Sequence, residues 1–296
     1  MPDHAVEDLD VVANGSARER VLSLLREQID ALREAEPGTR IGRDPEELHK
    51  MRTAVRRLRA TLGAVRDMFD PRWVSHLRRE LDWLGEILGA RRDLDVLHAH
   101  LSAQIAALRS GRVAARALLE RLDRRLARAG DRVRDAVESP RYARLLERLR
   151  AGVEHPPVVD AEVSLPQVAA RAFKKLRKAV EELPENPAAA DLHAVRIRVK
   201  RARYAAELAE PMAGRAAQRF IKRAKKLQDA LGEHQDAAVA EQRLRSLMRT
   251  ERRPLAVALS HRLVEAQRAR RQEAKADFVD GWPELERRGR KAWRKA

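Results

Sequence analysis

The sequence predicts an all-α protein built from two copies of one four-helix unit. First, apolar residues recur at three- and four-residue spacing over long stretches rich in Ala, Leu, Arg and Glu. Second, no segment shows the alternating β-branched pattern of strands. Third, two motifs of the first half of the chain return in the second half. The 296 residues are enough for two such cores, without disulfides because the chain has no cysteine.

Proline and glycine residues divide the chain into helical runs. The segments "VLSLLREQIDAL" (21–32) and "ALLERLDRRLARA" (117–129) show the helical period clearly. We expect breaks where Pro and Gly fall between such runs, near residues 37, 71, 111, 140, 156, 184, 211, 254 and 283. This division gives eight main helices with short extra pieces.

The proline-containing stretch "EHPPVVDAEVSLP" (154–166) interrupts the helical rhythm and is the best candidate for a connection between two halves. We therefore place a boundary near residue 160, with a first four-helix half at 17–153 and a second at 164–280. Residues 1–16 and 281–296 are expected to be flexible ends. The second of these ends has six basic residues after Glu286.

Two motifs recur at nearly the same spacing in both halves. "LHKMRTAVRRLR" (48–59) matches "LHAVRIRVKRAR" (192–203) at an offset of 144 residues. "LGEILGARRDLDVL" from residue 84 matches "LQDALGEHQDAAVA" from residue 227 at an offset of 143, so that Gly89 pairs with Gly232 and Asp93 with Asp236. Duplication of one four-helix unit is the simplest explanation.

Each copy of the first motif places a row of basic side chains on one face of a helix. At about 100° per residue, the first row falls within a sector of about 80° beside an apolar face, and the second row repeats this arrangement. The two rows consist of His49, Arg52, Arg56 and Arg59, and of His193, Arg196, Lys200 and Arg203.

These rows have few acidic partners at helical spacing. Residues 48–59 contain five Lys or Arg and no acid, and Glu207 is the one acid suitably spaced from the second row. Like charges at this spacing destabilise a helix, so an external polyanion would relieve the repulsion. A solvated charge run is the alternative for a single row, but the repetition of the His and cation positions favours ligand binding.

Further cations lie on neighbouring predicted helices. The segment "QRFIKRAKKLQ" (218–228) contributes Lys222, Lys225 and Lys226, whereas its first-half counterpart keeps only Arg79. We therefore expect the two halves to contribute unequally. The cluster "RAFKKLRK" (171–178) is equally consistent with a solvated face or a ligand role. Asp93 and Asp236 either orient a basic side chain or form ordinary ion pairs and caps.

At these motifs the sequence resembles the CHAD family, the conserved histidine α-helical domain, from about residue 17 to 280. The resemblance implies two four-helix bundles related by a pseudo-twofold, with a basic groove or pore between them. It also implies binding of inorganic polyphosphate and association with polyphosphate granules. Many relatives carry a preceding triphosphate tunnel domain with an ExExK signature. None is found here, so we expect a stand-alone, phosin-like protein that binds without hydrolysis.

Mapped onto this chain, the resemblance implies a polyphosphate site in two groups of residues. Arg offers phosphate a planar fork of donors, Lys a point charge, and His a ring donor that titrates near neutrality. The foremost residues are His49, Arg52, Arg56, Arg59, His193, Arg196, Lys200 and Arg203, followed by Lys222, Lys226 and Arg79. Arg57 and Arg201 are less certain because they project about 80° or more away from the rows.

Composition limits the partners. The formal net charge of +17 favours an anionic partner, while an aromatic content of 3% weakens any model of stacked bases. Nucleic acid thus remains an alternative to polyphosphate. No catalytic motif, metal-ligand set or cofactor-binding pattern is found, and His98, His100, His155 and His261 are interpreted as surface or packing residues. With no long apolar run and no secretory signal, we expect a cytoplasmic protein without membrane insertion.

Overall fold

The computed structural model describes residues 4–106, 112–159, 163–248, 254–294 and 296, and the all-α prediction is confirmed. The first half of the chain forms, in order, α1 (His4–Glu34), α2 (Glu36–Ile41), α3 (Pro45–Ala64), a 3-10 turn η1 (Arg66–Met68), α4 (Pro71–Ala106), α5 (Arg112–Val137) and α6 (Pro140–Glu154). The second half forms α7 (Leu165–Glu181), α8 (Ala189–Met248) and α9 (Pro254–Ala292). No strand occurs among these described residues.

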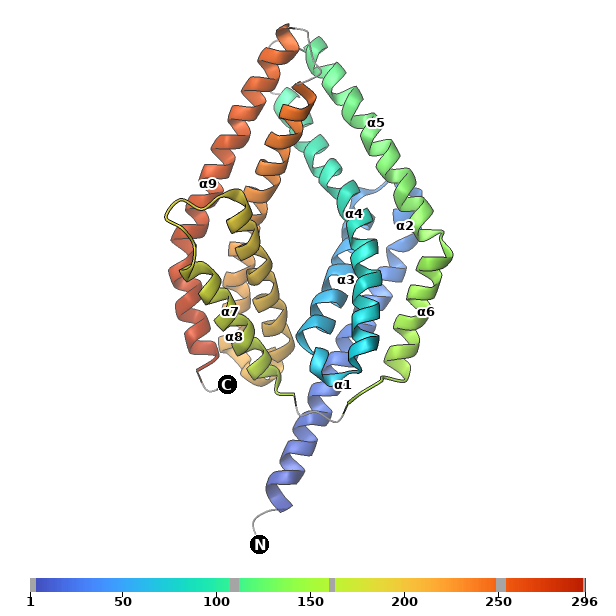
Figure 1. The fold of residues 1–296 in the computed structure, drawn as a ribbon, viewed down its shortest axis with the longest axis vertical. Coiled ribbons are helices and arrows are strands. Elements are labelled where there is room, and N and C mark those ends of the chain that lie inside the picture. Colours follow the sequence, from blue (N-terminus) through green and yellow to red (C-terminus); the bar gives the residue numbers. More distant parts are fainter. Residues whose placement is uncertain (1–3, 107–111, 160–162, 249–253, 295) are drawn as a thin grey trace.

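The two halves lie side by side, and in each of them a long helical hairpin extends toward the same end of the molecule (Figure 1). One hairpin consists of α4 and α5, the other of α9 and the C-terminal part of α8. The halves also meet through α3, which contacts α8. The two helices that carry the predicted basic rows are therefore neighbours, although the rows are 144 residues apart in sequence.

Most predicted breaks coincide with helix ends because Pro is tolerated in the first turn of a helix but not in its interior. Pro71, Pro140 and Pro254 each begin a helix. The break expected near residue 211 is a bend within α8 at Gly214, whose φ of 56° and ψ of −142° are non-helical. The break near residue 111 and the boundary near residue 160 lie outside the described residues.

The prediction of a flexible C-terminal end at 281–296 is wrong, as is the helix break near residue 283. Helix α9 passes through Pro283 and continues to Ala292. Leu285 is fully buried and Trp293 is 7% exposed, with its ring 5.9 Å from that of Phe220. Apolar burial against α8 therefore outweighs the local cost of the proline. At the other end, α1 begins at His4, and its first turns extend away from both halves (Figure 1).

Two apolar cores hold the molecule together. The main core is continuous through both halves and includes buried residues next to the basic rows, such as Met51, Val55, Val195 and Val199. A second, smaller core lies where the hairpins meet. It joins α4 and α5 to α8 and α9 through Leu97, Leu101, Ile105, Leu122, Ala240, Leu244, Leu263 and Val264. The halves are thus connected both at α3 and α8 and near the tips of the hairpins.

Candidate functional site

A cavity of about 700 Å³ lies between the two halves and is lined by α3, α4, α8 and α9. Its lining includes nine Lys or Arg side chains from both halves, which are Arg52, Arg56, Arg57, Arg92, Arg196, Lys200, Arg203, Lys225 and Arg270. Four acids accompany them, namely Asp93, Asp229, Glu233 and Asp236. Nine cations against four carboxylates leave a formal charge of +5 around this single space.

Local sequence explains why α3 presents its row to the cavity. Asp44 caps the helix by accepting a hydrogen bond from the Glu46 backbone N–H at 2.8 Å, and Pro45 occupies the first helical position. The apolar residues Met51, Val55 and Leu58 then face the core and are at most 1% exposed. Because the basic row lies beside this apolar face, burial of the apolar face turns the basic row toward the cavity.

Helix α8 repeats this construction. The Asp191 carboxylate accepts a hydrogen bond from the Ala188 backbone N–H at 2.8 Å and fixes the start of the helix. Val195, Val199 and Ala202 are at most 1% exposed in the core. The basic side chains next to them consequently project toward α3 across the cavity.

The structure brings together seven of the eleven predicted site residues. The cavity lining contains His49, Arg52, Arg56, His193, Arg196, Lys200 and Arg203. Four predicted residues, Arg59, Arg79, Lys222 and Lys226, do not belong to that lining. All four residues of the second row and three of the first thus share one space, whereas Arg59 of α3, Arg79 of α4 and the pair Lys222 and Lys226 of α8 lie outside it.

The positions of these four residues have simple causes. Arg59 forms an ion pair with Asp82 of α4, and the Arg79 guanidinium lies 3.2 Å from the His76 ring nitrogen Nδ1. Lys222 and Lys226 are exposed, and Lys225 lines the cavity in their place. One step along a helix turns the side chain by about 100°, so Lys226 projects away from the face that Lys225 shares with the cavity.

Several lining residues were missed or undervalued by sequence reasoning. Arg57 lines the cavity despite its angle to the row, and His100 does so although we expected a surface or packing role. Arg92 aligns with Gln235 at the offset of 143, and both positions line the cavity, but neither was predicted to do so. Arg270 comes from α9, which carries neither motif, and no sequence signal marked it.

A hydrogen bond joins the first row to α8 beside the cavity, and contacts within α8 hold Arg203. Arg56 Nε donates to the hydroxyl oxygen of Tyr204 at 2.8 Å, which joins α3 to α8. The Arg203 guanidinium lies 4.4 Å from the centre of the Tyr204 ring. Arg203 also donates to Gln228 Oε1 at 3.0 Å and pairs with Glu207, so it is held in place before any ligand binds. Arg203 is thus the most firmly positioned member of the second row.

The two repeated aspartates lie near the inner arginines. Arg52 and Asp93 are 4.0 Å apart, a long and weak ion pair. The repeated glycines face the same arginines, since a Cβ on Gly89 would be 3.6 Å from Arg52 Nε and one on Gly232 would be 3.9 Å from Arg196 Nε. The glycines at corresponding positions of the two halves therefore make similar local contacts, and the internal repeat stays a prediction.

Enclosure perturbs the charges in the cavity. Burial, together with the neighbouring Arg196, Arg56 and Arg52, lowers the pKa of Lys200 to about 6, while Asp236 raises it only in part. Burial also raises the pKa of Asp236, against the effect of Arg196. Burial thus disfavours the charged form of both groups. For Lys200, three neighbouring guanidinium groups add to this effect.

The two histidines of the rows differ in their surroundings. His193 Nδ1 lies 2.9 Å from Gln235 Oε1, which identifies Nδ1 as the protonated nitrogen because an amide oxygen can only accept. In the first half, His49 Nδ1 is buried without a hydrogen-bond partner among the described residues. Burial and the nearby Arg92 lower the pKa of His49. The neutral form of His49 is thus favoured until an anion enters.

The described ranges contain neither a metal-binding cluster nor a membrane-spanning helix. No group of three or more His, Asp or Glu side chains is arranged to hold a metal ion there. Over the same residues, no helix combines the length and apolar character needed to cross a membrane.

Comparison with known proteins identifies relatives of this arrangement. The CHAD domain family model matches residues 23–245. The uncharacterized protein Rv2226 of Mycobacterium tuberculosis is 31% identical over 209 residues, which cover 67% of this chain and 39% of that protein. MT2285, from another strain of the same organism, matches equally well. The chain thus spans about two fifths of the length of these curated relatives.

Two solved structures share the fold. PptA from Streptomyces chartreusis matches with a TM-score of 0.75 and 24% identity, covering 90% of this chain and 99% of that one. The CHAD domain from the plant Ricinus communis matches with a TM-score of 0.67 and 26% identity, covering 94% of this chain and 92% of that one. The helical arrangement around the cavity is therefore one that other proteins also adopt.

Proposed function

The chain belongs to the CHAD domain family, and on that premise we propose that its central cavity binds inorganic polyphosphate. One observation carries the proposal. Basic residues from two helices that are far apart in sequence, including Arg52 and Arg56 of α3 and Arg196 and Lys200 of α8, line the same cavity. Their mutual repulsion is incompletely neutralised, so an anion that enters the space stabilises it.

The ligand chemistry follows from the lining. The formal excess of five positive charges, nine cations less four acids, matches a short run of a polymer that carries roughly one negative charge per phosphate. Arginine forks bind phosphate oxygens in two-point fashion, and histidine N–H groups add directional donors. Binding releases counterions, so the affinity falls steeply as salt increases.

Nucleic acid is the alternative, and the cavity offers it little. Proteins that hold single strands usually provide aromatic side chains on which the bases stack. None of the residues that line the cavity is Phe, Tyr or Trp. A chain of phosphates without bases fits this lining better. As the resemblance to the family implies, we further propose that the protein binds polyphosphate at granules without hydrolysing it.

The test is an affinity measurement for polyphosphate at several ionic strengths. Arg196→Ala should weaken binding about tenfold or more, because one charge-assisted contact is lost. Arg79→Ala is the matched control, since it also removes one arginine but lies outside the cavity lining, and it should change the affinity less than about twofold. An affinity independent of salt would contradict the proposal.

Two competing functions are tested with the same protein. Duplex DNA, added at matched phosphate concentration, should not displace polyphosphate, and equal displacement would favour the nucleic-acid alternative. Incubation of polyphosphate with the protein and divalent metal should release no phosphate above background. Sustained release would instead establish a hydrolase.

A further inference from the structure

A second hollow, of about 470 Å³, adjoins the central cavity on the side of the second half. It lies over the first turn of α8, the C-terminal part of α8 and the facing side of α9. The two spaces share His193, Gln235 and Val239 in their linings. The hydrogen-bonded pair of His193 and Gln235 therefore stands at the border between them.

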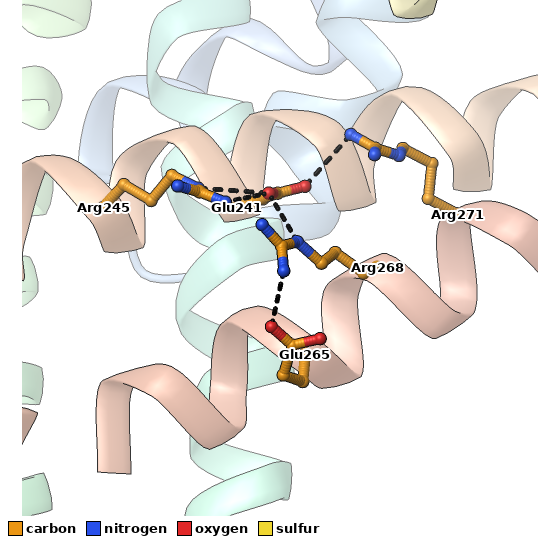
Figure 2. A network of polar contacts seen from close by, with 5 residues as sticks. All are labelled: Glu241, Arg245, Glu265, Arg268 and Arg271. Carbon is orange, nitrogen blue, oxygen red and sulfur yellow. Dashed lines mark hydrogen bonds and ion pairs between the residues drawn. The ribbon is translucent and has the colours of Figure 1, made fainter. Parts of the chain in front are cut away.

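A cluster of three arginines around one carboxylate adjoins this hollow (Figure 2). Glu241 of α8 accepts hydrogen bonds on Oε1 from Arg245 Nη2 at 2.9 Å and from Arg268 Nε at 3.1 Å, and on Oε2 from Arg271 Nη1 at 3.0 Å. Arg268 also donates to Glu265 at 2.6 Å. Of the three arginines, Arg245 and Arg271 belong to the lining of the hollow.

The cluster retains positive charge and unused donors. Three guanidinium groups face two carboxylates, which leaves a formal charge of +1 before His193 is considered. Burial alone would raise the pKa of Glu241, but hydrogen bonds from Arg245 and Arg268 hold that pKa below its usual value. A guanidinium has five N–H donors, and Arg271 gives one of them to Glu241. The remaining donors are available to a ligand.

The fixed position of these arginines also favours a ligand role. The Glu241 side chain is 10% exposed, so its carboxylate is anchored at the base of the cluster while Arg271 and Arg245 are 30% and 52% exposed. Side chains that are already ordered lose less conformational entropy when an anion binds. A surface arginine without such an anchor would bind phosphate less effectively.

We propose that this second hollow is a phosphate subsite, in which a polyphosphate chain that leaves the central cavity past His193 continues over Arg271 and Arg245. The inference rests on the proposed function and adds to it the path of the longer chain. With this subsite, the protein should bind polyphosphate chains that are long enough to occupy both spaces more tightly than shorter ones.

The path is specific to the second half. At the offset of 143, the residues that align with Glu241 and Arg245 are His98 and Ser102. His98 pairs instead with Asp123 at 3.0 Å. The α4 positions that correspond to Glu241 and Arg245 thus carry neither a carboxylate nor a guanidinium, which favours exit of the extended chain over the second half.

The experiment compares the affinities of two ligands, tripolyphosphate and a polyphosphate of several tens of phosphates. In Arg271→Ala, the affinity for the long chain should fall about tenfold and its salt dependence should lose about one unit of slope. The affinity for tripolyphosphate, which the central cavity can hold alone, should change less than about twofold. Arg245→Ala provides a second variant, whose loss leaves Glu241 paired with Arg268 and Arg271.

Arg290→Ala is the matched control. Arg290 lies near the C-terminal end of α9, is 59% exposed, and pairs with Glu286 four residues away, as Arg245 pairs with Glu241. It should affect neither ligand. Equal losses for both ligands in Arg271→Ala, or no loss for the long chain, would overturn the subsite. If the unmodified protein bound neither ligand, the proposed function itself would be wrong.

Discussion

Binding of polyphosphate should be coupled to uptake of a proton by Lys200. In the free protein the pKa of this amine is lowered to about 6, by burial and by Arg196, Arg56 and Arg52. With that pKa, about 3% of the amine is protonated at pH 7.5. A phosphate anion favours the ammonium form and raises the pKa again. The bound protein should therefore hold about one more proton at Lys200 than the free protein.

The sign of the pH dependence follows directly. Because the complex binds more protons than the free protein, affinity rises as the pH falls toward 6. One proton corresponds to about a tenfold change in affinity per pH unit, between the lowered pKa of free Lys200 and the raised pKa of the complex. In Lys200→Arg the side chain remains charged throughout, so this contribution disappears.

Calorimetric titration in buffers of different ionisation enthalpy measures the number of protons taken up. Terminal phosphates of the ligand and His49 also titrate, but they contribute equally to the parent protein and to the variant. The difference between the two proteins therefore isolates Lys200 and should be about one proton at pH 7.5. Equal proton numbers for both would refute the coupling.

Three other substitutions have defined expectations. Lys200→Met should raise the free energy of unfolding of the free protein by about 1–3 kcal/mol in urea, because it removes a basic group that is buried among three arginines. It should also weaken polyphosphate binding, and a lower free energy of unfolding would contradict the reasoning. Trp293→Ala should destabilise the protein by about 3–5 kcal/mol, since the indole is buried against Phe220, and an unchanged unfolding midpoint would support a flexible end instead. Gly214→Ala should cost about 1–3 kcal/mol, because its φ of 56° is strained for an L-residue; thermal unfolding measures this effect, and an unchanged melting temperature would exclude the strain.

Much of the fold follows from local sequence. The helical period and the positions of Pro71, Pro140 and Pro254 locate helices correctly because apolar burial and the missing proline N–H act over a few residues. The end of α9 could not be located in this way. Pro283 and the basic residues beyond it resemble a frayed terminus, whereas Trp293 is ordered by Phe220, which is 73 positions earlier in the sequence.

The candidate site shows the same limit. The basic rows of α3 and α8 could be predicted because each lies beside an apolar face of its helix. Burial of that face fixes the direction in which the row points. Lys225 and Lys226 are adjacent in one basic run, and only the packing of α8 decides which of them faces the cavity. Arg270 could not be predicted, since its place in the site depends on how α9 packs beside α8 and on its hydrogen bond of 2.7 Å with His100 in the other half.

The small apolar core near the hairpin tips connects two halves whose facing surfaces carry like charges. Electrostatic repulsion across the cavity acts to separate them, and this force is greatest in dilute electrolyte, where counterions screen least. The tips should consequently open before the main core, with faster amide hydrogen exchange around Leu101 and Leu244 than around Val55 and Val199. Moderate concentrations of an inert salt should slow that exchange and raise the melting temperature, the reverse of the response of a protein stabilised by surface ion pairs.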